Sequence, residues 1–355
     1  MRIAISGASG YIGQHLSSFL EGKGYDVIPL GRDLFKEDCF DELCRCVESC
    51  EVVINLAGAS INKRWTEAYK QELYDSRICV TRQLVHAINT RSVKLELFIS
   101  ASAVGYYPAF GEYDEYHDCR GMDFLARLCG VWEEEASACS SGVRLVITRF
   151  GVVLSEDGGA LKEMLRLQRF SRVSVVIGNG QQRFPWISLF DLCRSFGYII
   201  RNRQMRGVVN LVSPDLITQK QLAHTLARAD KIRRIIPLPK FFFRLKFGEG
   251  ASFVTKGQTV HPSKLQESGF TYIYPTIEKL MNITDHHTVP ELDVKRYMGR
   301  WYEIARYENH FERGMTDVTA TYTLLPDGKI RVENEGYKGG VHKKATGRAK
   351  QPDPK

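Results

Sequence analysis

The chain has 355 residues, 43% of them hydrophobic, and a formal net charge of +8, which predicts two or three soluble domains with an ordinary core. Its Lys and Arg residues are scattered rather than gathered in one stripe, which argues against a nucleic-acid partner. No apolar run approaches the roughly 18 residues of a membrane helix and no leader-like segment precedes the first apolar run, so we expect a cytoplasmic protein with reduced thiols and no membrane partner.

The first half of the chain alternates short apolar runs with amphipathic stretches. Buried strands, rich in Val and Ile, are predicted at residues 2–6, 26–30, 52–57, 95–102 and 144–151. Helices are predicted between them at residues 12–21, 35–49, 67–89 and 124–138. This alternation is typical of an α/β fold in which helices cover both faces of a parallel sheet, the doubly wound Rossmann type.

The turn between the first predicted strand and the first predicted helix reads Gly-Ala-Ser-Gly-Tyr-Ile-Gly over residues 7–13. Glycines at this spacing allow a tight turn and a close backbone approach to a pyrophosphate, and the N-terminus of the following helix attracts an anion. We therefore expect a nicotinamide dinucleotide here, with an ordinary strand-to-helix turn as the alternative. The residues expected to contact it are Gly7, Ser9, Gly10, Tyr11, Ile12 and Gly13.

The end of the second predicted strand bears on the type of dinucleotide. An acidic residue at this place usually holds the ribose hydroxyls of NAD, whereas an arginine accommodates the 2′-phosphate of NADP. The sequence after Leu30 is Gly31-Arg32-Asp33. Arg32 therefore favours NADP(H), and Asp33 keeps NAD(H) as the alternative.

Four of the nine cysteines lie in or beside the second predicted helix, at Cys39, Cys44, Cys46 and Cys50. Their spacing contains no C-x2-C pair, and only some of these thiols share a face of the helix. We interpret them as small, partly buried side chains and expect no metal site.

Beyond residue 156 the pattern becomes mixed, with a helix at 159–170, strands at 173–177 and 207–212, and a capping box from Thr218 to Gln221. The aromatic-rich segment 237–250 is interpreted as a helix that packs on the core. Residues 284–290 are polar and end in proline, which predicts a linker. Further on, Pro-Asp-Gly at 326–328 between alternating apolar patterns predicts a hairpin turn.

Ordered motifs over residues 1–283 resemble the extended short-chain dehydrogenase/reductase superfamily. They are the glycine turn, Asn-Leu-Ala-Gly at 55–58, Ser-Ala-Ser-Ala-Val-Gly-Tyr-Tyr at 100–107, Thr-Arg-Phe-Gly-Val-Val-Leu at 148–154 and Phe-Pro-Trp-Ile-Ser at 184–188. More narrowly, they resemble an atypical bacterial group, the NAD-dependent epimerase/dehydratase-like oxidoreductases with a C-terminal region of unknown function. The resemblance implies that Leu56, Ala57 and Gly58 line the adenosine half of the cofactor site. It also implies that Ser102 hydrogen-bonds a substrate carbonyl or alcohol.

The acid–base pair of that superfamily, Tyr-x-x-x-Lys, is missing from the chain. Phe124 and Leu128 occupy roughly its places. In the superfamily the lysine lowers the pKa of the tyrosine, which is otherwise about 10. Tyr106 and Tyr107 follow Ser102 closely; we expect a phenol here, that of Tyr106, to replace the proton donor and Arg149 to supply the missing positive charge. The alternative is that both tyrosines only pack at a strand end and donate hydrogen bonds.

Residues 291–355 resemble the opening of a bacterial lipocalin, in which Gly299-Arg300-Trp301 would form the first barrel strand and the tryptophan would close the barrel base. Only about three strands are available here, whereas a lipocalin barrel has eight. We therefore expect a truncated, antiparallel lipocalin-like segment fused to the dehydrogenase-like part. Its open edge would allow self-association.

Together these patterns predict four segments: a dinucleotide-binding domain at 1–155 whose sheet continues into 205–215, a smaller α/β substrate-side region at 156–283, the linker 284–290 and the tail 291–355. The favoured function is an NADP(H)-dependent oxidoreductase or epimerase-like activity on an unidentified small carbonyl or hydroxy compound, sugar-nucleotide-like molecules included. The alternatives are a non-catalytic dinucleotide-binding sensor or scaffold, and a fusion whose lipocalin-like end binds a hydrophobic ligand.

Overall fold

The computed structural model describes residues 1–91, 94–283, 293–302 and 315–349. The chain divides into two compact units, residues 1–284 and 285–355. The predicted linker 284–290 lies outside the described residues. Within the described ranges, none of the helices combines the length and the apolar character that crossing a membrane requires.

A six-stranded parallel sheet forms the centre of the first unit, with the strand order β10-β6-β4-β3-β1-β2. Its strands are β1 (Arg2–Ser6), β2 (Asp26–Leu30), β3 (Val52–Asn55), β4 (Leu97–Ala103), β6 (Arg144–Phe150) and β10 (Gly207–Leu211). The chain runs outward from β1 to β2 and then returns across β1 to β3, so the strand order reverses at β1. Parallel sheets of this kind bind ligands at the carboxyl ends of the strands beside such a reversal. The predicted Rossmann-type fold is confirmed.

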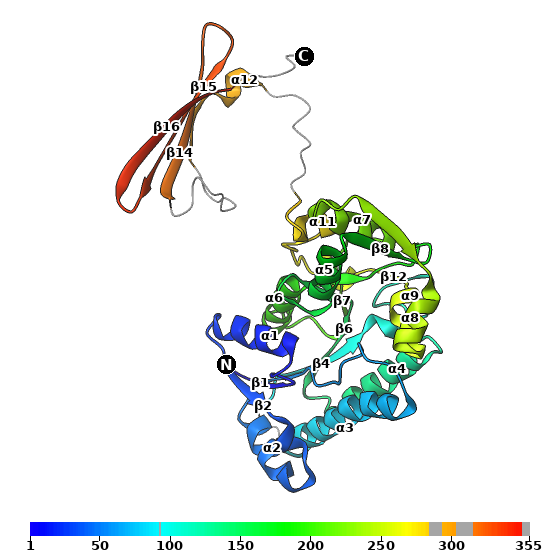
Figure 1. Ribbon diagram of the computed structural model, residues 1–355. Coiled ribbons are helices and arrows are strands. Elements are labelled where there is room, and N and C mark those ends of the chain that lie inside the picture. Colours follow the sequence, from blue (N-terminus) through cyan, green and yellow to red (C-terminus); the bar gives the residue numbers. More distant parts are fainter. Residues whose placement is uncertain (92–93, 284–292, 303–314, 350–355) are drawn as a thin grey trace. The chain divides into compact units, whose positions relative to one another are not determined.

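Helices cover both faces of this sheet (Figure 1). They are α1 (Tyr11–Glu21) and α6 (Leu189–Arg201) on one face, and α2 (Phe40–Glu48), α3 (Glu67–Arg91) and α4 (Phe124–Ser137) on the other. Successive side chains of a strand point to opposite faces. Ile3 and Ile5 of β1 accordingly pack with Leu16 of α1, whereas Ala4 packs with Leu43 of α2, and all five are fully buried.

The rest of the first unit is built around three short parallel strand pairs. They are β5 (Glu112–Tyr113) with β12 (Thr259–Val260), β7 (Val152–Ser155) with β9 (Trp186–Ser188), and β8 (Val173–Ile177) with β11 (Arg234–Leu238). The accompanying helices are α5 (Gly159–Ser171), α7 (Gln219–Ala229), α8 (Lys240–Phe247), α9 (Ser252–Thr255), α10 (Ser263–Glu267) and α11 (Ile277–Leu280). The predicted capping box is confirmed at α7, where Thr218 and Gln221 each accept a backbone N–H of the other.

The prediction that segment 237–250 packs on the core is wrong. The segment begins inside β11 and continues as α8, in which no residue is buried. Phe241 is 52% exposed and Leu245 is 62% exposed. The short helix carries basic residues on different sides, so it has no continuous apolar face to bury.

The second unit contains a four-stranded antiparallel sheet in the order β13-β14-β15-β16. Its elements are α12 (Val294–Tyr297), β13 (Gly299–Tyr302), β14 (Met315–Leu324), β15 (Ile330–Lys338) and β16 (Val341–Ala349). The predicted hairpin turn joins β14 to β15, with Gly328 at φ +76°. Trp301 is 48% exposed and donates its indole N–H to the carbonyl of Tyr297 at 2.9 Å. All nine residues of β16 are exposed, and self-association through this edge stays a prediction.

Candidate functional site

The glycine turn follows β1 at the carboxyl edge of the parallel sheet. Gly7 has φ +73°, and a Cβ added there would lie 2.8 Å from the backbone of Leu56. A Cβ at Gly13 would lie 2.2 Å from the carbonyl oxygen of Gly7. Gly10 is the N-cap of α1, and no side chain makes a capping hydrogen bond there. The turn therefore leaves helix N–H groups accessible to a pyrophosphate, and side chains at positions 7 and 13 would deform it.

The other three predicted contacts at this turn differ in exposure. Ser9 is exposed, and its carbonyl accepts a hydrogen bond from the side chain of Gln14 at 3.1 Å. The ring of Tyr11 lies directly over Gly158, since a Cβ there would stand 2.2 Å from the ring. Ile12 packs against the core between the sheet and α1. Tyr11 and Ile12 therefore offer a ligand at this turn their backbone N–H groups rather than their side chains.

The loop after β3 is held from below by the buried amide of Asn55. Its Oδ1 accepts hydrogen bonds from Ser6 Oγ at 2.6 Å and from the backbone N–H of Ala57 at 3.3 Å. Its Nδ2 donates to Thr81 Oγ1 of α3 at 2.8 Å. This network fixes the predicted adenosine-side residues, Leu56–Gly58, against the glycine turn.

The sequence analysis missed Arg77 of α3, which holds the same loop from its other side. Its Nη2 donates to the carbonyl of Ala59 at 2.9 Å, and its guanidinium lies where a Cβ at Gly58 would meet it at 2.9 Å. Burial lowers the pKa of Arg77. Arg77 therefore supports this loop from α3, and the sequence motif at residues 55–58 does not include it.

Arg32 lies directly after β2 as the first residue of a short 3₁₀ helix (Arg32–Phe35), and its side chain is exposed. The neighbouring Asp33 pairs with Lys36 at 2.5 Å. The hydrogen bond from Lys36 lowers the pKa of Asp33 and engages one of its two carboxylate oxygens. Among the described residues Arg32 has no carboxylate partner, so its guanidinium is available to an anion.

Ser102 takes part in a buried polar network at the ends of β4 and β6. The register of these strands places Ser102 directly beside Arg149. Both are bound to Glu133 of α4, which accepts from Ser102 Oγ at 2.6 Å and from Arg149 through two bonds of 2.8 and 2.7 Å. The sequence analysis missed Glu133. All three residues are buried, and the hydroxyl proton of Ser102 is directed to the protein.

Tyr106 lies next to this network and reaches further toward the surface. The guanidinium of Arg149 stacks on its ring, 3.5 Å from the ring centre. Its phenol donates to Asp118 at 2.9 Å. Burial and this hydrogen bond raise the pKa of Tyr106, and the attraction of Arg149 does not offset them. Tyr106 is therefore a protonated phenol at neutral pH.

The places of the missing Tyr-x-x-x-Lys pair contain no proton donor. Leu128 is 3% exposed, and Phe124 packs edge-on against Trp65 with ring centres 5.4 Å apart. The ammonium of Lys70 lies 5.6 Å from the Phe124 ring, but it is paired with Glu67 and Glu249. This part of α4 serves packing, and the polar groups of the edge lie around Arg149.

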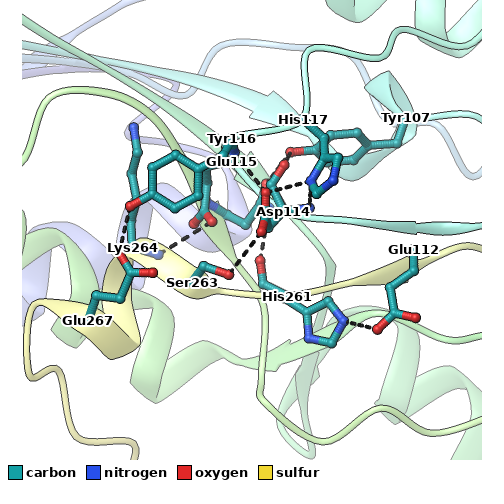
Figure 2. Close-up of polar contacts among 11 residues, drawn as sticks. Tyr107, Glu112, Asp114, Glu115, Tyr116, His117, His261, Ser263, Lys264 and Glu267 are labelled. Carbon is teal, nitrogen blue, oxygen red and sulfur yellow. Dashed lines mark hydrogen bonds and ion pairs between the residues drawn. The ribbon is translucent and has the colours of Figure 1, made fainter.

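A set of hydrogen bonds ties the segment after Tyr106 to the segment 261–267 (Figure 2). Glu112 pairs with His261 at 2.5 Å, and Tyr116 donates to Glu267 at 2.5 Å. Glu115 accepts the backbone N–H of Asn210 at 2.8 Å, and burial raises the pKa of Glu115. Within the described ranges no group of three or more His, Cys, Asp or Glu side chains could hold a metal ion. These contacts therefore fasten a loop at the edge of the candidate site.

Three protein families match successive parts of the chain. The NAD dependent epimerase/dehydratase family matches residues 3–211, a domain of unknown function (DUF1731) matches residues 238–282, and the lipocalin-like domain matches residues 292–355. The epimerase family protein SH2119 of Staphylococcus haemolyticus is 35% identical, covering 77% of this chain and 95% of the relative. The epimerase family protein YfhF of Bacillus subtilis is 34% identical, covering 81% of this chain and all of the relative.

A solved structure of the human epimerase family protein SDR39U1 (isoform 2) with NADPH is 32% identical to this chain. The two structures agree with a TM-score of 0.73 over 79% of this chain and 98% of the human one. A nicotinamide dinucleotide is thus supported as the cofactor class. The glycine turn, the parallel sheet and these matches show that the chain belongs to the NAD dependent epimerase/dehydratase family, with a lipocalin-like segment at its C-terminal side.

Proposed function

We propose that this protein is an NADP(H)-dependent oxidoreductase or epimerase-like enzyme acting on a small carbonyl or hydroxy compound. The observation that carries the proposal is the exposed guanidinium of Arg32 at the end of β2, beside an aspartate whose carboxylate is already paired with Lys36. A free arginine at this place suits a 2′-phosphate, and the neighbouring Asp33 already pairs one carboxylate oxygen with Lys36. The NADPH in the human relative is consistent with this assignment.

The cradle for the dinucleotide fits the residues present. A Cβ at Gly13 would fill the space between the helix and the turn, and Gly7, Ser9 and Gly10 surround the accessible N–H groups of α1. When bound there, the nicotinamide ring supplies or accepts a hydride. Leu56, Ala57 and Gly58 would line the adenosine half of the bound dinucleotide.

The proposed chemical groups of the chain itself are Tyr106 and Ser102. Tyr106 is held protonated beside Arg149, and its proton lies in the hydrogen bond to Asp118 at 2.9 Å, so it would have to leave Asp118 to donate that proton to an oxygen that develops negative charge. Ser102 gives its own proton to Glu133, so its remaining hydrogen-bonding capacity is that of an acceptor. It would therefore position a substrate alcohol rather than polarise a carbonyl.

One observation favours a second candidate, a dinucleotide-binding sensor or scaffold without turnover. Phe124 and Leu128 fill the places of the superfamily's acid–base pair, and the cation beside the Phe124 ring, Lys70, is held by two carboxylates. Such a protein would bind NADPH as tightly as an enzyme does and would show no hydride transfer with any carbonyl compound.

The proposal is tested by titrating the full chain with NADPH and with NADH and following nicotinamide fluorescence. We expect tighter binding of NADPH, and the variant Arg32→Ala should remove most of this preference while leaving the affinity for NADH unchanged. The control is Arg45→Ala, which removes one exposed positive charge from α2. Equal titration curves for the two dinucleotides, unchanged in Arg32→Ala, would refute the NADP(H) assignment. The enzyme is distinguished from the non-catalytic sensor by measuring NADPH oxidation with a panel of aldehydes and ketones, which only the enzyme would show.

A further inference from the structure

A cavity of about 400 Å³ lies in the substrate-side part of the first unit. Its wall comes from four segments that are far apart in sequence, at residues 110–111, 179–183, 240 and 255–259. A second hollow of about 440 Å³ shares Gln181 and Arg183 with it and adds Lys220 to the wall. Convergence of separate loops on one concave surface is typical of a small-molecule site.

The wall of the first cavity is positively charged. It contains Arg183 and Lys240 and three side-chain amides, and none of the described residues that line it is Asp or Glu. Arg183 gives one N–H to the carbonyl of Leu216 at 3.0 Å, which leaves the other donors of its guanidinium available. The structure gives the ammonium of Lys240 no carboxylate partner among the described residues. Unpaired cations beside amide donors are suited to bind an anion.

This wall is fixed by close backbone packing. A Cβ at Gly257 would lie 1.9 Å from the carbonyl oxygen of Arg183, so the two segments touch through their backbones. The amide of Gln182 donates to the carbonyls of Ile177 and Val254 at 3.2 and 3.3 Å. Its Oε1 is buried without a hydrogen-bond partner among the described residues. The cavity therefore has a preformed wall.

One wall segment of the cavity is bonded to the candidate catalytic edge. Gln258, between two lining residues, donates to the carbonyl of Val104 at 2.5 Å. Val104 begins the short 3₁₀ helix (Val104–Tyr106) that carries the proposed proton donor Tyr106. This hydrogen bond therefore joins the segment 255–259, which lines the cavity, to the segment that carries Tyr106.

An aromatic ring completes the wall. Phe110 is 73% exposed, an unusual state for a phenylalanine, although its carbonyl is held by the phenol of Tyr113 at 2.8 Å. The pair Glu112–His261 ties the following strand to the opposite segment (Figure 2). The ring is thus an exposed apolar group on a fastened loop, available to stack on a flat ligand.

We infer that this cavity binds the anionic end of the substrate, a carboxylate or phosphate joined to a planar ring, with Arg183 and Lys240 at the anion and Phe110 at the ring. The inference rests on the proposed function, which leaves the substrate unidentified. Lys240 belongs to α8, so this exposed helix contributes to substrate choice.

The test uses the full chain saturated with NADPH, so that the dinucleotide already occupies the glycine turn. Phenyl phosphate, benzoate and their neutral match benzyl alcohol are titrated by calorimetry, with inorganic phosphate as the anion without a ring. We expect at least one aryl anion to bind more tightly than both benzyl alcohol and inorganic phosphate. The better of the two aryl anions identifies the phosphate or the carboxylate as the natural group.

Lys240→Ala should weaken binding of that anion about tenfold, because a hydrogen bond to a charged group is lost. Phe110→Ala should weaken the binding of aryl anions and leave the binding of inorganic phosphate unchanged. The matched control is Lys256→Ala, an exposed lysine close in sequence to the wall but outside the cavity lining. Each variant is first checked for an unchanged thermal midpoint and an unchanged NADPH affinity.

The inference is overturned if neither aryl anion saturates the wild-type protein at millimolar concentration. It is also overturned if Lys240→Ala weakens binding no more than Lys256→Ala. Failure of NADPH to bind would instead refute the proposed function. Titration of the dinucleotide-free protein with the same anions would then still decide whether the cavity is an anion site.

Discussion

Replacing Gly13 by Ala tests how the glycine turn binds its ligand. The new Cβ would stand 2.2 Å from the carbonyl oxygen of Gly7 and 2.7 Å from the Cα of Ala8. Ordinary contacts of a Cβ begin at 3.4 Å, so the turn and the helix must separate by about 1.2 Å. The displaced atoms belong to the turn that carries the N–H groups offered to the pyrophosphate.

The size of the effect follows from the cost of overpacking. Forcing a methyl group into a well-packed region costs about 1–3 kcal/mol. If binding must restore the original turn, this cost corresponds to a loss of roughly 5- to 150-fold in NADPH affinity. Alanine inside a helix gains about 0.5–1 kcal/mol over glycine, so the free energy of unfolding should fall less than the binding free energy.

The assay is a fluorescence titration with NADPH, accompanied by thermal unfolding of the same samples. The control is Gly142→Ala, because a Cβ there meets only Ser140 Oγ, at 3.9 Å. We expect Gly142→Ala to bind NADPH like the wild type and Gly13→Ala to bind it at least fivefold more weakly. If Gly13→Ala binds within twofold of the wild type, the argument that the turn cannot accommodate a side chain fails.

Three further predictions concern other parts of the chain. Glu133→Ala leaves the guanidinium of Arg149 buried without its carboxylate, so urea unfolding should show a loss of about 3–5 kcal/mol in the free energy of unfolding. Glu134→Ala, which removes an exposed carboxylate next to it, should lose less than about 1 kcal/mol, and equal losses in the two variants would contradict this prediction. Burial raises the pKa of the Cys129 and Cys193 thiols to about 12. Because the thiolate is the nucleophile, both should resist Ellman's reagent at about pH 8, whereas the exposed Cys79 and Cys119 should react. Rapid reaction of all nine thiols in the native protein would show that these sites are open. Removal of residues 285–355 deletes the second compact unit and should leave NADPH affinity within twofold; a large loss would show that the tail contributes to the cofactor domain.

The parts of the fold that could be predicted are those set by local sequence. Strands β1 and β2 have their predicted bounds, because a short apolar run between turn residues has few other stable conformations. The glycine turn could be identified for the same reason, since its requirements are steric and concern neighbouring residues. Strand pairs of only two or three residues, such as β5 with β12, have no comparable pattern and depend on long-range packing.

The candidate site was harder to predict because its polar groups meet through tertiary contacts. Ser102 and Arg149 could be named from their places at strand ends, but their common partner Glu133 lies on α4, in a sequence that reads as an ordinary amphipathic helix. Only the register of β4 with β6 and the docking of α4 bring the three together. The same is true of Arg183 and Lys240, which share a cavity across more than fifty residues of sequence.

The buried network explains how the family fold persists without the superfamily's tyrosine and lysine. In the superfamily the lysine stands one helical turn from the tyrosine and lowers its pKa, whereas here the cation is Arg149 on β6 and its charge is matched by Glu133. Arg149 touches Tyr106 through the face of the ring, and the pKa of that phenol is still raised. A phenol held in its protonated form is suited to give a proton to a developing alkoxide and poorly suited to accept one. The glycine turn places no such requirement on side chains, so it can be kept whichever residues stand at the places of the acid–base pair.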